Sequence, residues 1–360
     1  MHAELKSELL ADMGQLIDSG AFVDGGAVRA FEEAFARFCG RSECVGTSSG
    51  LDALRLALIA AGIGPGDEVV LPAQTFVATL EAVVQAGATP VLADVSESDY
   101  NLDPQAAAAA AGESTRALLP VHLYGQLADM NALAALAGRL GCAIVEDACQ
   151  AHGARRDGHA PASAGSAAAF SFYPSKNLGA FGDAGACVTG EPELAATVRA
   201  LRQHGQRERH RHDLVGYTAR LDTVQAHALL RKLPLLAGWN EQRRVAASAY
   251  TVALEGVGDL MLPPVAPGSQ PVWHVYVVRT AEPERLGGFL AERGIGTGRH
   301  YPVPLHLAPA YAHLGHGEGE FPVAEALSRQ GISLPIFPGI TEPELDAVGD
   351  AVKAYFKQGS

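Results

Sequence analysis

In the first two-thirds of the chain, hydrophobic residues either recur at the spacing of a helix or form short continuous runs. Phe31, Phe35 and Phe38 lie on one face of a predicted helix, and leucines in the segment 51–58 repeat that spacing. Short apolar runs lie between the helical segments, and the predicted strands cover 68–71, 89–94, 116–121 and 142–147. The predicted helices between them cover 75–86, 129–140 and the alanine run 106–111, which Asp103 precedes as N-cap.

Strands that are apolar on both faces and separated by helices predict a mainly parallel sheet with helices on both sides, an α/β fold. The pattern changes after about residue 205. Two long helices are expected over 221–233 and 235–254, and residues 272–278 alternate as in a half-exposed strand. We therefore predict a large α/β domain over 1–235, N-terminal helix included, and a smaller α+β domain over 236–360.

Composition and charge narrow the classes of function. The net charge of −13 opposes nucleic acid as the main ligand, because phosphates require a basic surface. No apolar run approaches the roughly 18 residues of a membrane span, and the acidic N-terminus does not resemble a secretory signal. Five cysteines without a Cys-x-x-Cys pair are typical of a reducing compartment. We expect a cytoplasmic protein that binds neither nucleic acid nor membrane.

A carboxylate and a lysine stand at the ends of two predicted strands. Asp147 follows the buried run 143–145, where its charge needs a partner. Lys176 lies in a turn rich in Pro, Asn and Gly after an apolar-aromatic run. Together they suit a site for pyridoxal phosphate, in which the lysine forms a Schiff base and the carboxylate keeps the pyridine nitrogen protonated. The alternatives are a carboxylate that caps a neighbouring loop and an ordinary surface lysine.

A small polar cluster at 46–52 opens a predicted helix, so free backbone N–H groups there favour a phosphate. Ser49, Gly50 and Leu51 are the candidates in this cluster, and simple helix capping is the alternative.

Three further side chains are candidates for contact with the cofactor. Ser171 could add a hydroxyl to the phosphate, and Gln150 could hydrogen-bond the ring's phenolic oxygen. Phe76 either stacks on the pyridine ring or belongs to the core, and both readings stay open.

The thirteen histidines do not predict a metal site. His204, His210 and His212 fall in a polar stretch without carboxylate or thiol ligands at useful spacing. The loop that begins with His300 and Tyr301 carries imidazole, aromatic and proline groups, and we interpret it as the rim of a substrate site.

Taken together, these segments resemble the pyridoxal-phosphate-dependent nucleotide-sugar aminotransferases, the DegT/StrS group of the aspartate-aminotransferase fold. The similar segments lie in the family's order and cover nearly the whole chain: 64–70, 120–126, 146–154, 170–179, 201–205, 220–226, 300–302 and 333–335.

The resemblance implies roles for these candidates. Lys176 would be the Schiff-base lysine that forms the internal aldimine, and Asp147 would be the partner of the pyridine nitrogen. The remaining cofactor contacts that it implies are Gly50, Leu51, Phe76, Gln150 and Ser171.

The resemblance also implies a homodimer with composite active sites. In the family a loop written Gly-x-Asn-x-Arg-Leu reaches the neighbour's cofactor phosphate. Here residues 216–221 carry Thr218 in place of the amide, so a hydroxyl would make that contact weakly or through water. Arg220 of the same loop joins His300 and Tyr301 as a candidate for substrate binding.

Some relatives lack the lysine and perform dehydration, so the retained Lys176 favours transamination. The implied reaction is ping-pong: glutamate, or glutamine, donates its amino group to a keto group of a nucleotide-linked sugar. The stretch 271–276 and the short N-terminus favour the branch that aminates C3 of 3-keto-6-deoxyhexoses in antibiotic and glycan pathways. A 4-keto sugar, an aminocyclitol ketone and a non-catalytic regulatory role are the alternatives.

Overall fold

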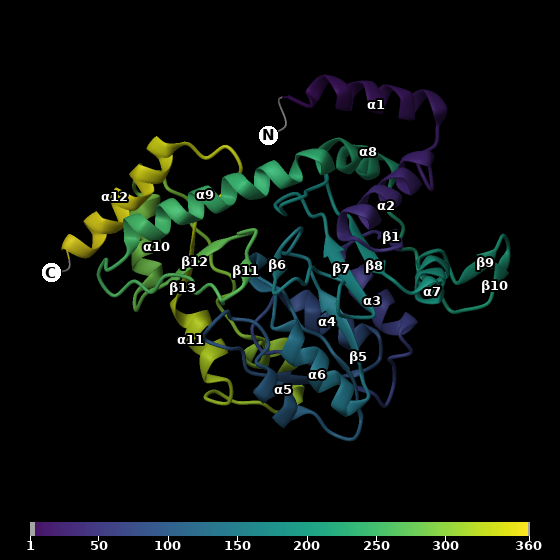
Figure 1. The fold of residues 1–360 in the computed structure, drawn as a ribbon, viewed down its shortest axis with the longest axis horizontal. Coiled ribbons are helices and arrows are strands. Elements are labelled where there is room, and N and C mark those ends of the chain that lie inside the picture. The colour runs from purple at the N-terminus through teal and green to yellow at the C-terminus, as the bar shows by residue number, and fades with distance from the viewer. Residues whose placement is uncertain (1–3, 359–360) are drawn as a thin grey trace.

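A seven-stranded sheet forms the centre of the molecule in this computed structural model, which describes residues 4–358 (Figure 1). In spatial order its strands are β1 (Glu43–Thr47), β8 (Gly185–Thr189), β7 (Ala167–Ser171), β5 (Ala143–Asp147), β4 (Thr115–Leu118), β2 (Glu68–Pro72) and β3 (Thr89–Ala93). The five strands from β7 to β3 are mutually parallel, and β8 runs antiparallel to β7 and β1. The predicted mainly parallel sheet is confirmed.

Helices cover both faces of this sheet, because alternate residues of a strand pack into different hydrophobic clusters. Val69 and Leu71 of β2 pack in one cluster, and Val70 between them packs in another. The first face is covered by α3 (Gly50–Ala60), α4 (Val77–Gln85) and α7 (Pro192–Arg202). The second face is covered by α2 (Gly26–Cys39), α5 (Pro104–Ala110), α6 (Met130–Leu140) and α8 (Thr223–Lys232).

The predicted N-cap of α5 is confirmed, whereas the predicted end of strand β4 is wrong. Asp103 caps α5 as predicted, since its carboxylate accepts from the backbone N–H groups of Gln105 and Ala106 at 2.6 and 3.0 Å. Strand β4 is shorter than predicted and ends at Leu118. Pro120 has no N–H with which to extend the ladder.

The C-terminal part of the chain has its own small core. In it, α9 (Leu236–Leu254), α10 (Pro283–Ala291) and α12 (Glu342–Gln358) pack against the antiparallel pair β12 (Tyr276–Arg279) and β13 (Gly331–Leu334). Leu236, the first residue of α9, packs under the large sheet, whereas the buried apolar residues from Ala246 to Leu254 pack in the C-terminal core. We propose a domain division at residues 235 and 236 on the basis of this change in packing.

The prediction of a half-exposed strand over 272–278 is wrong. Strand β12 begins at Tyr276, and all four of its residues are buried. Tyr276 packs in the C-terminal core while Val277 packs in the core of the large sheet, so both faces of the strand are covered. The preceding residues form a loop, in which Val272 and His274 donate backbone hydrogen bonds to the segment Leu123–Gly125 at 2.9 Å.

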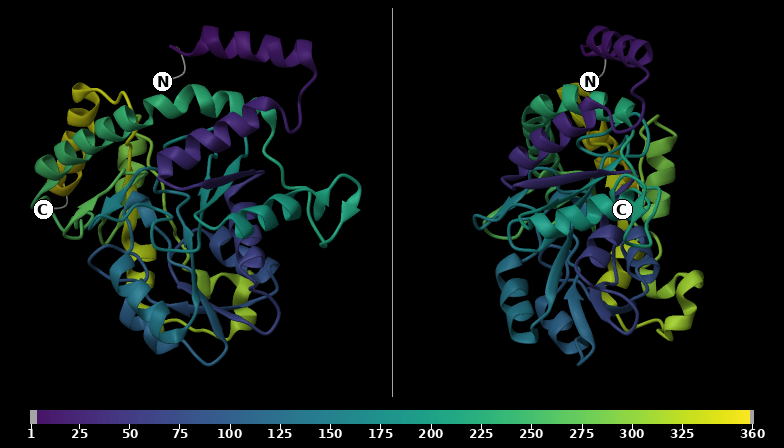
Figure 2. Two further views of the ribbon diagram at one scale, coloured as in Figure 1. Left: turned by 45° about the vertical axis from the view of Figure 1, so that its right-hand side comes forward. Right: turned by 90° about the vertical axis from the view of Figure 1, so that its right-hand side faces the viewer.

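Two elements project from the body, a helix at the N-terminus and a hairpin near α7 (Figure 2). The helix is α1 (Lys6–Ser19), and the hairpin is β9 (Gln206–Glu208) with β10 (Arg211–His212). Arg231 of α8 holds α1 in place, because its guanidinium donates to both carboxylate oxygens of Asp12 at 2.7 Å.

The remaining elements are short. They are α11 (Pro322–Gln330), the pair β6 (Arg155–Arg156) and β11 (Ser269–Gln270), and the 3-10 helices at Leu123–Gly125, Leu233–Leu235, Leu305–Leu307 and Pro309–Leu314.

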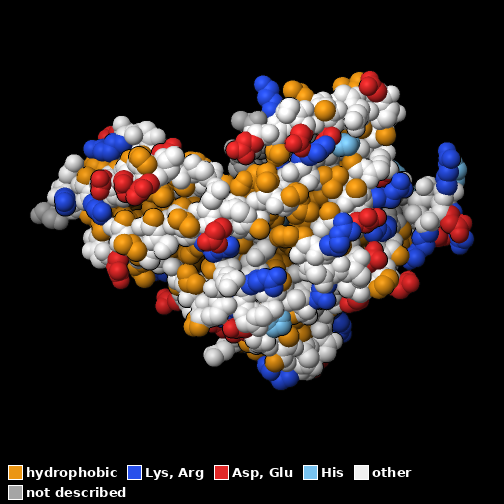
Figure 3. Space-filling model, turned by 45° about the horizontal axis from the view of Figure 1, so that its top comes forward, with side chains coloured by type: hydrophobic (Ala, Val, Ile, Leu, Met, Phe, Trp, Pro, Cys, Tyr) orange, Lys and Arg blue, Asp and Glu red, His pale blue; other side chains and the backbone are white. Residues whose placement is uncertain are grey.

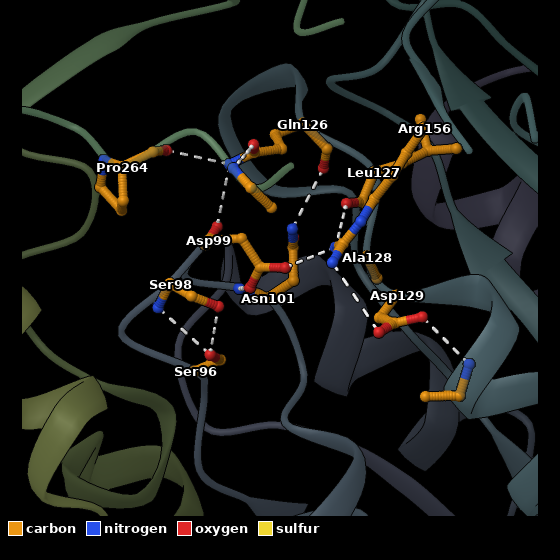
Figure 4. Close-up of polar contacts among 12 residues, drawn as sticks. Ser96, Ser98, Asp99, Asn101, Gln126, Leu127, Ala128, Asp129, Arg156 and Pro264 are labelled. Carbon is orange, nitrogen blue, oxygen red and sulfur yellow. Dashed lines mark hydrogen bonds and ion pairs between the residues drawn. The ribbon is translucent and has the colours of Figure 1, made fainter. Parts of the chain in front are cut away.

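A buried polar network ties the loop after β3 to the C-terminal half (Figure 4). The Arg156 guanidinium donates to the Asp99 carboxylate at 2.6 Å, and the two side chains are nearly buried. Gln126 donates to the carbonyl oxygen of Pro264 at 3.1 Å and accepts from the backbone N–H of Ala266 at 2.9 Å. These contacts fix the long connection between α9 and β12 against the large sheet.

Among residues 4–358, no helix combines the length and the hydrophobicity needed to cross a membrane.

Candidate active site

A cavity of about 320 Å³ opens where β5 and β7 end and where α3 and α4 begin. Ligands of open α/β sheets bind at the carboxyl ends of the strands, and this cavity lies in that position. The structure brings most of the predicted site residues to it: Ser49, Gly50, Leu51, Phe76, Asp147, Gln150, Ser171, Lys176, His300 and Tyr301.

Asp147 lies at the last position of β5 and is almost fully buried. One carboxylate oxygen accepts from the Thr79 hydroxyl at 2.7 Å, and the other accepts from the backbone N–H of Cys149 at 3.1 Å. The Thr79 hydroxyl lies 3.0 Å from that of Thr75, one turn earlier. Asp147 therefore caps its own turn and also lines the cavity.

Behind Asp147, the strand is anchored by a pair of fully buried side chains. The Glu146 carboxylate lies 2.9 Å from Nε2 of His122 and accepts from the backbone N–H groups of Ala162 and Gly165. Nδ1 of His122 accepts from the backbone N–H of Ala128, so Nε2 carries the ring proton and donates to Glu146. This satisfied pair holds the end of β5, and with it Asp147.

Lys176 lies in the turn after β7, lines the cavity and is half-buried, so the surface-lysine interpretation is wrong. Burial lowers the pKa of Lys176, and this effect outweighs the nearby Cys149 and Asp147, which act to raise it. A lysine with a lowered pKa carries an unprotonated amine more often near neutral pH, as a nucleophile and general base requires.

The start of α3 forms a narrow cradle. Ser49 caps the helix, since its hydroxyl accepts from the backbone N–H of Asp52 at 3.1 Å. A Cβ on Gly50 would lie 2.7 Å from both the Cys149 sulfur and the Ser171 Cβ, so only glycine fits. The first backbone N–H groups of a helix lack intrahelical partners. The cradle therefore presents donors to a small anion, which fits the phosphate of pyridoxal phosphate.

Aromatic and amide groups also line the cavity. The Phe76 side chain is 51% exposed and its ring centroid lies 5.4 Å from that of Tyr301, so Phe76 does not belong to the buried core. Gln150 accepts from the backbone N–H of Tyr124 at 2.7 Å and donates to the Tyr301 hydroxyl at 3.1 Å. Nδ1 of His300 lies 2.7 Å from the Ser333 hydroxyl.

Two candidates, Thr218 and Arg220, do not line the cavity of their own chain. Thr218 is exposed, and its hydroxyl lies 3.2 Å from Nε2 of His204. One Arg220 nitrogen lies 3.4 Å from the same His204 atom. The three side chains form a group near the hairpin.

Sequence reasoning missed Thr79 and His274, which also line the cavity. The pair of threonines one turn apart at the start of α4 was a visible signal for the first. His274 falls within the stretch 271–276 that resembles the family, but it was interpreted there as part of a half-exposed strand and given no place in the site.

The histidine at 152 is fully buried, and neither of its ring nitrogens has a hydrogen-bond partner among the described residues. Its ring packs against those of Phe170 and Phe172, at centroid distances of 5.4 and 5.7 Å. Burial lowers the pKa of His152 to about 3, and the charge of Lys176 acts in the same direction.

We expect this histidine to make the protein sensitive to acid. Between its unfolded pKa of 6.5 and its folded pKa of about 3, the unfolded chain binds a proton that the folded chain does not. Stability present above pH 6.5 is therefore lost as the pH falls, by about 1.4 kcal/mol per pH unit. Urea unfolding between pH 7 and pH 5 measures this slope. The slope should be smaller in His152→Leu, and an unchanged slope in that variant would contradict the assignment.

Comparisons with known proteins agree with this geometry. A model of the DegT/DnrJ/EryC1/StrS aminotransferase family matches residues 3–353. The dTDP-3-amino-3,4,6-trideoxy-alpha-D-glucose transaminase of Streptomyces venezuelae is 48% identical over 98% of this chain and 93% of its own length. The crystal structure of S. venezuelae DesV with a ketimine intermediate superimposes with a TM-score of 0.96, at 48% identity, over 99% of this chain and 96% of the other.

A further solved structure, NtdA from Bacillus subtilis with bound cofactor PMP, has a TM-score of 0.92 and 28% identity. It covers 99% of this chain and 83% of the other.

Proposed function

This chain belongs to the DegT/DnrJ/EryC1/StrS aminotransferase family, and from that premise we propose that it moves the amino group of glutamate to C3 of a nucleotide-linked deoxyhexose. It is a transaminase, and its cofactor is pyridoxal phosphate. The proposal rests mainly on one observation: a single cavity is lined by Lys176, Asp147 and the start of α3. The name of the S. venezuelae relative supports C3 as the position.

The bound cofactor supplies an electron sink for the carbon that gains or loses a proton. Asp147 is held by Thr79 with its charge in a nearly buried position, where it can keep a ring nitrogen protonated. Lys176 anchors the cofactor and then moves the proton at the substrate carbon. Gly50 and Leu51 offer backbone donors for the phosphate, and Ser171 adds a hydroxyl beside them.

Phe76 and Gln150 complete the proposed cofactor contacts. The exposed ring of Phe76 faces the cavity and can cover one side of the pyridine ring. The Gln150 amide donates one hydrogen to the Tyr301 hydroxyl, and its second hydrogen can be donated to the phenolic oxygen of the cofactor ring. We place His300 and Tyr301 at the sugar, because both side chains line the same cavity.

We also propose a homodimer in which each chain completes the site of the other. The group of His204, Thr218 and Arg220 lies away from the cavity of its own chain, and it has donors to offer a neighbour. Hydrophobic side chains spread across the middle of one face of the molecule (Figure 3). The exposed large hydrophobic residues include Leu10, Ile17, Phe22, Val23 and Phe181.

Thr218→Asn is expected to tighten cofactor binding about fivefold, because an amide reaches further than a hydroxyl and one hydrogen bond contributes about 1 kcal/mol. The measurement is a titration of the cofactor-free protein with pyridoxal phosphate, followed by absorbance. Thr251→Asn, on α9 and far from the hairpin, is the matched control. Equal affinity in wild type and Thr218→Asn would remove this residue from the cofactor site.

The keto compound that accepts the amino group distinguishes the C3 proposal from the alternative substrates. We expect transfer from glutamate to a dTDP-linked 3-keto-6-deoxyhexose and much slower transfer to its 4-keto isomer or to an aminocyclitol ketone. Equal or faster transfer to either of those compounds would overturn the assignment of C3 as the position aminated. It would leave the assignment of transaminase activity intact. Loss of all transfer in a cofactor-loaded protein would favour a regulatory role.

All five cysteines are free, which is typical of a reducing compartment and supports a cytoplasmic location.

A further inference from the structure

Lys232, the last residue of α8, is buried although its side chain carries a charge. Burial alone lowers the pKa of Lys232, to about 8, because no carboxylate of residues 4–358 contributes to the shift. A buried cation without an opposite charge costs stability, which an apolar side chain at the same position would not. The free energy of folding therefore does not explain a lysine here, and its contacts indicate another role.

The Lys232 ammonium contacts the end of the turn that carries Lys176. Its Nζ donates to the carbonyl oxygen of Gly179 at 2.5 Å and lies 4.4 Å from the centroid of the Phe181 ring, where the face of the ring attracts a cation. Gln225, two helical turns earlier on the same side of α8, accepts from the backbone N–H of Phe181 at 2.8 Å. Helix α8 therefore holds the end of this turn at two points.

The turn itself is closed and tightly packed. The backbone N–H of Ala180 donates to the carbonyl of Phe172 at 2.7 Å, and Lys176 lies in the segment between them. A Cβ on Gly179 would lie 2.4 Å from the carbonyl oxygen of Pro174, so no side chain fits there. Because the two ends of the turn touch, a shift of Gly179 also moves the backbone that carries Lys176.

A second set of contacts holds the residue after Lys176. The Asn177 amide nitrogen donates to the side-chain oxygen of Asn240 at 2.9 Å and to the carbonyl of Val272 at 2.8 Å. Asn240 belongs to α9. The turn is therefore fixed by two helices, by α8 through Lys232 and by α9 through Asn240.

Lys232 reaches Lys176 only through this backbone. It does not line the active-site cavity, and the charge of neither lysine contributes to the shift in the pKa of the other. An effect of Lys232 on the chemistry of Lys176 is therefore an effect of position.

We propose that Lys232 is a positioning residue, whose ammonium fixes the carbonyl of Gly179 and so holds the Lys176 amine in place for its reaction with the aldehyde of the cofactor. In that reaction the amine nitrogen adds to the aldehyde carbon, a carbon–nitrogen double bond forms and one water leaves. The inference deepens the proposed function and rests on it, because that function requires Lys176 to bond with the cofactor.

The test compares two ligands of cofactor-free Lys232→Met by equilibrium dialysis. Methionine fills the space of the lysine chain but has no donor. Pyridoxal phosphate bonds covalently with Lys176, whereas pyridoxamine phosphate carries an amine in place of the aldehyde and does not. We expect pyridoxal phosphate to bind about tenfold more weakly, the effect of one hydrogen bond from a charged donor, and the Kd of pyridoxamine phosphate to stay within about twofold.

Two further variants make the comparison specific. Lys232→Gln keeps a donor on a side chain one bond shorter, so it should show a smaller loss in the same direction, and it carries the test if Lys232→Met does not fold. Arg231→Met is the matched control, since Arg231 precedes Lys232 on α8 but donates to Asp12 of α1. It should bind both ligands as the wild type does.

Equal weakening of both ligands in a folded Lys232 variant would show that this lysine supports the cavity as a whole, and would overturn the proposal. Unchanged binding of both ligands would overturn it as well. Failure of the transaminase function would look different, as a wild-type protein in which borohydride reduction fixes no pyridoxal phosphate on Lys176, read by peptide mass spectrometry.

Discussion

Replacing Lys176 with alanine is expected to lower amino transfer at least about 10⁴-fold, since one side chain supplies both the covalent anchor and the acid–base group. The lysine lines the cavity, and burial holds its pKa below the usual value. The measurement is glutamate-dependent amination of the keto sugar under saturating pyridoxal phosphate. The absorption band of covalently held cofactor should vanish in the same variant.

Lys353→Ala is the matched control, because this lysine lies on α12 and pairs with Asp350 far from the cavity. It should retain wild-type activity and spectrum. Retention of more than about one-hundredth of the activity by Lys176→Ala would exceed what general acid–base catalysis without the lysine allows, and would contradict its assignment.

The second large effect is expected from Asp147→Asn, which should lower the turnover about 10³-fold. An amide keeps the hydrogen-bonding shape but supplies no charge to hold a proton on the ring nitrogen, so the electron sink weakens. The amide oxygen can still accept from the backbone N–H of Cys149, while the Thr79 hydroxyl can turn to accept from the amide nitrogen and donate to Thr75. We therefore expect the variant to fold. Turnover and thermal unfolding of the same preparation separate loss of catalysis from loss of structure.

Asp183→Asn is the control for this prediction. Asp183 is a second carboxylate in the lining of the cavity, but it is exposed to solvent and its charge is screened. The change should cost less than about tenfold in turnover. Similar losses in the two variants would show that the cavity needs negative charge in general rather than a carboxylate at Asp147.

Much of the site could be predicted because it is built on the ends of strands. The apolar runs before Asp147 and Lys176 predicted two buried strands, and parallel neighbours end at the same edge of the sheet. The start of α3 followed from its capping pattern, and Ser49 does cap that helix. The proximity of Asp147 and Lys176, which are 29 positions apart, therefore followed from local sequence patterns.

The missed residues depend on tertiary packing instead. His274 lies in a loop that was predicted as strand, because alternation alone does not show that a second core will cover the other face of residues 276–279. Phe76 could not be classified from the sequence, since a phenylalanine at the start of a helix suits a cavity or a core equally. Its exposed fraction of 51% decides the question.

The central claim is tested most directly by the absorption spectrum of the protein loaded with pyridoxal phosphate, recorded before and after glutamate and then after a dTDP-linked 3-keto-6-deoxyhexose. The account predicts that glutamate converts the band of covalently held cofactor to that of the amine form. The sugar should then restore the first band and yield one 3-amino sugar for each cofactor restored. No band after reconstitution, or a band that glutamate leaves unchanged, would contradict a transaminase that uses Lys176.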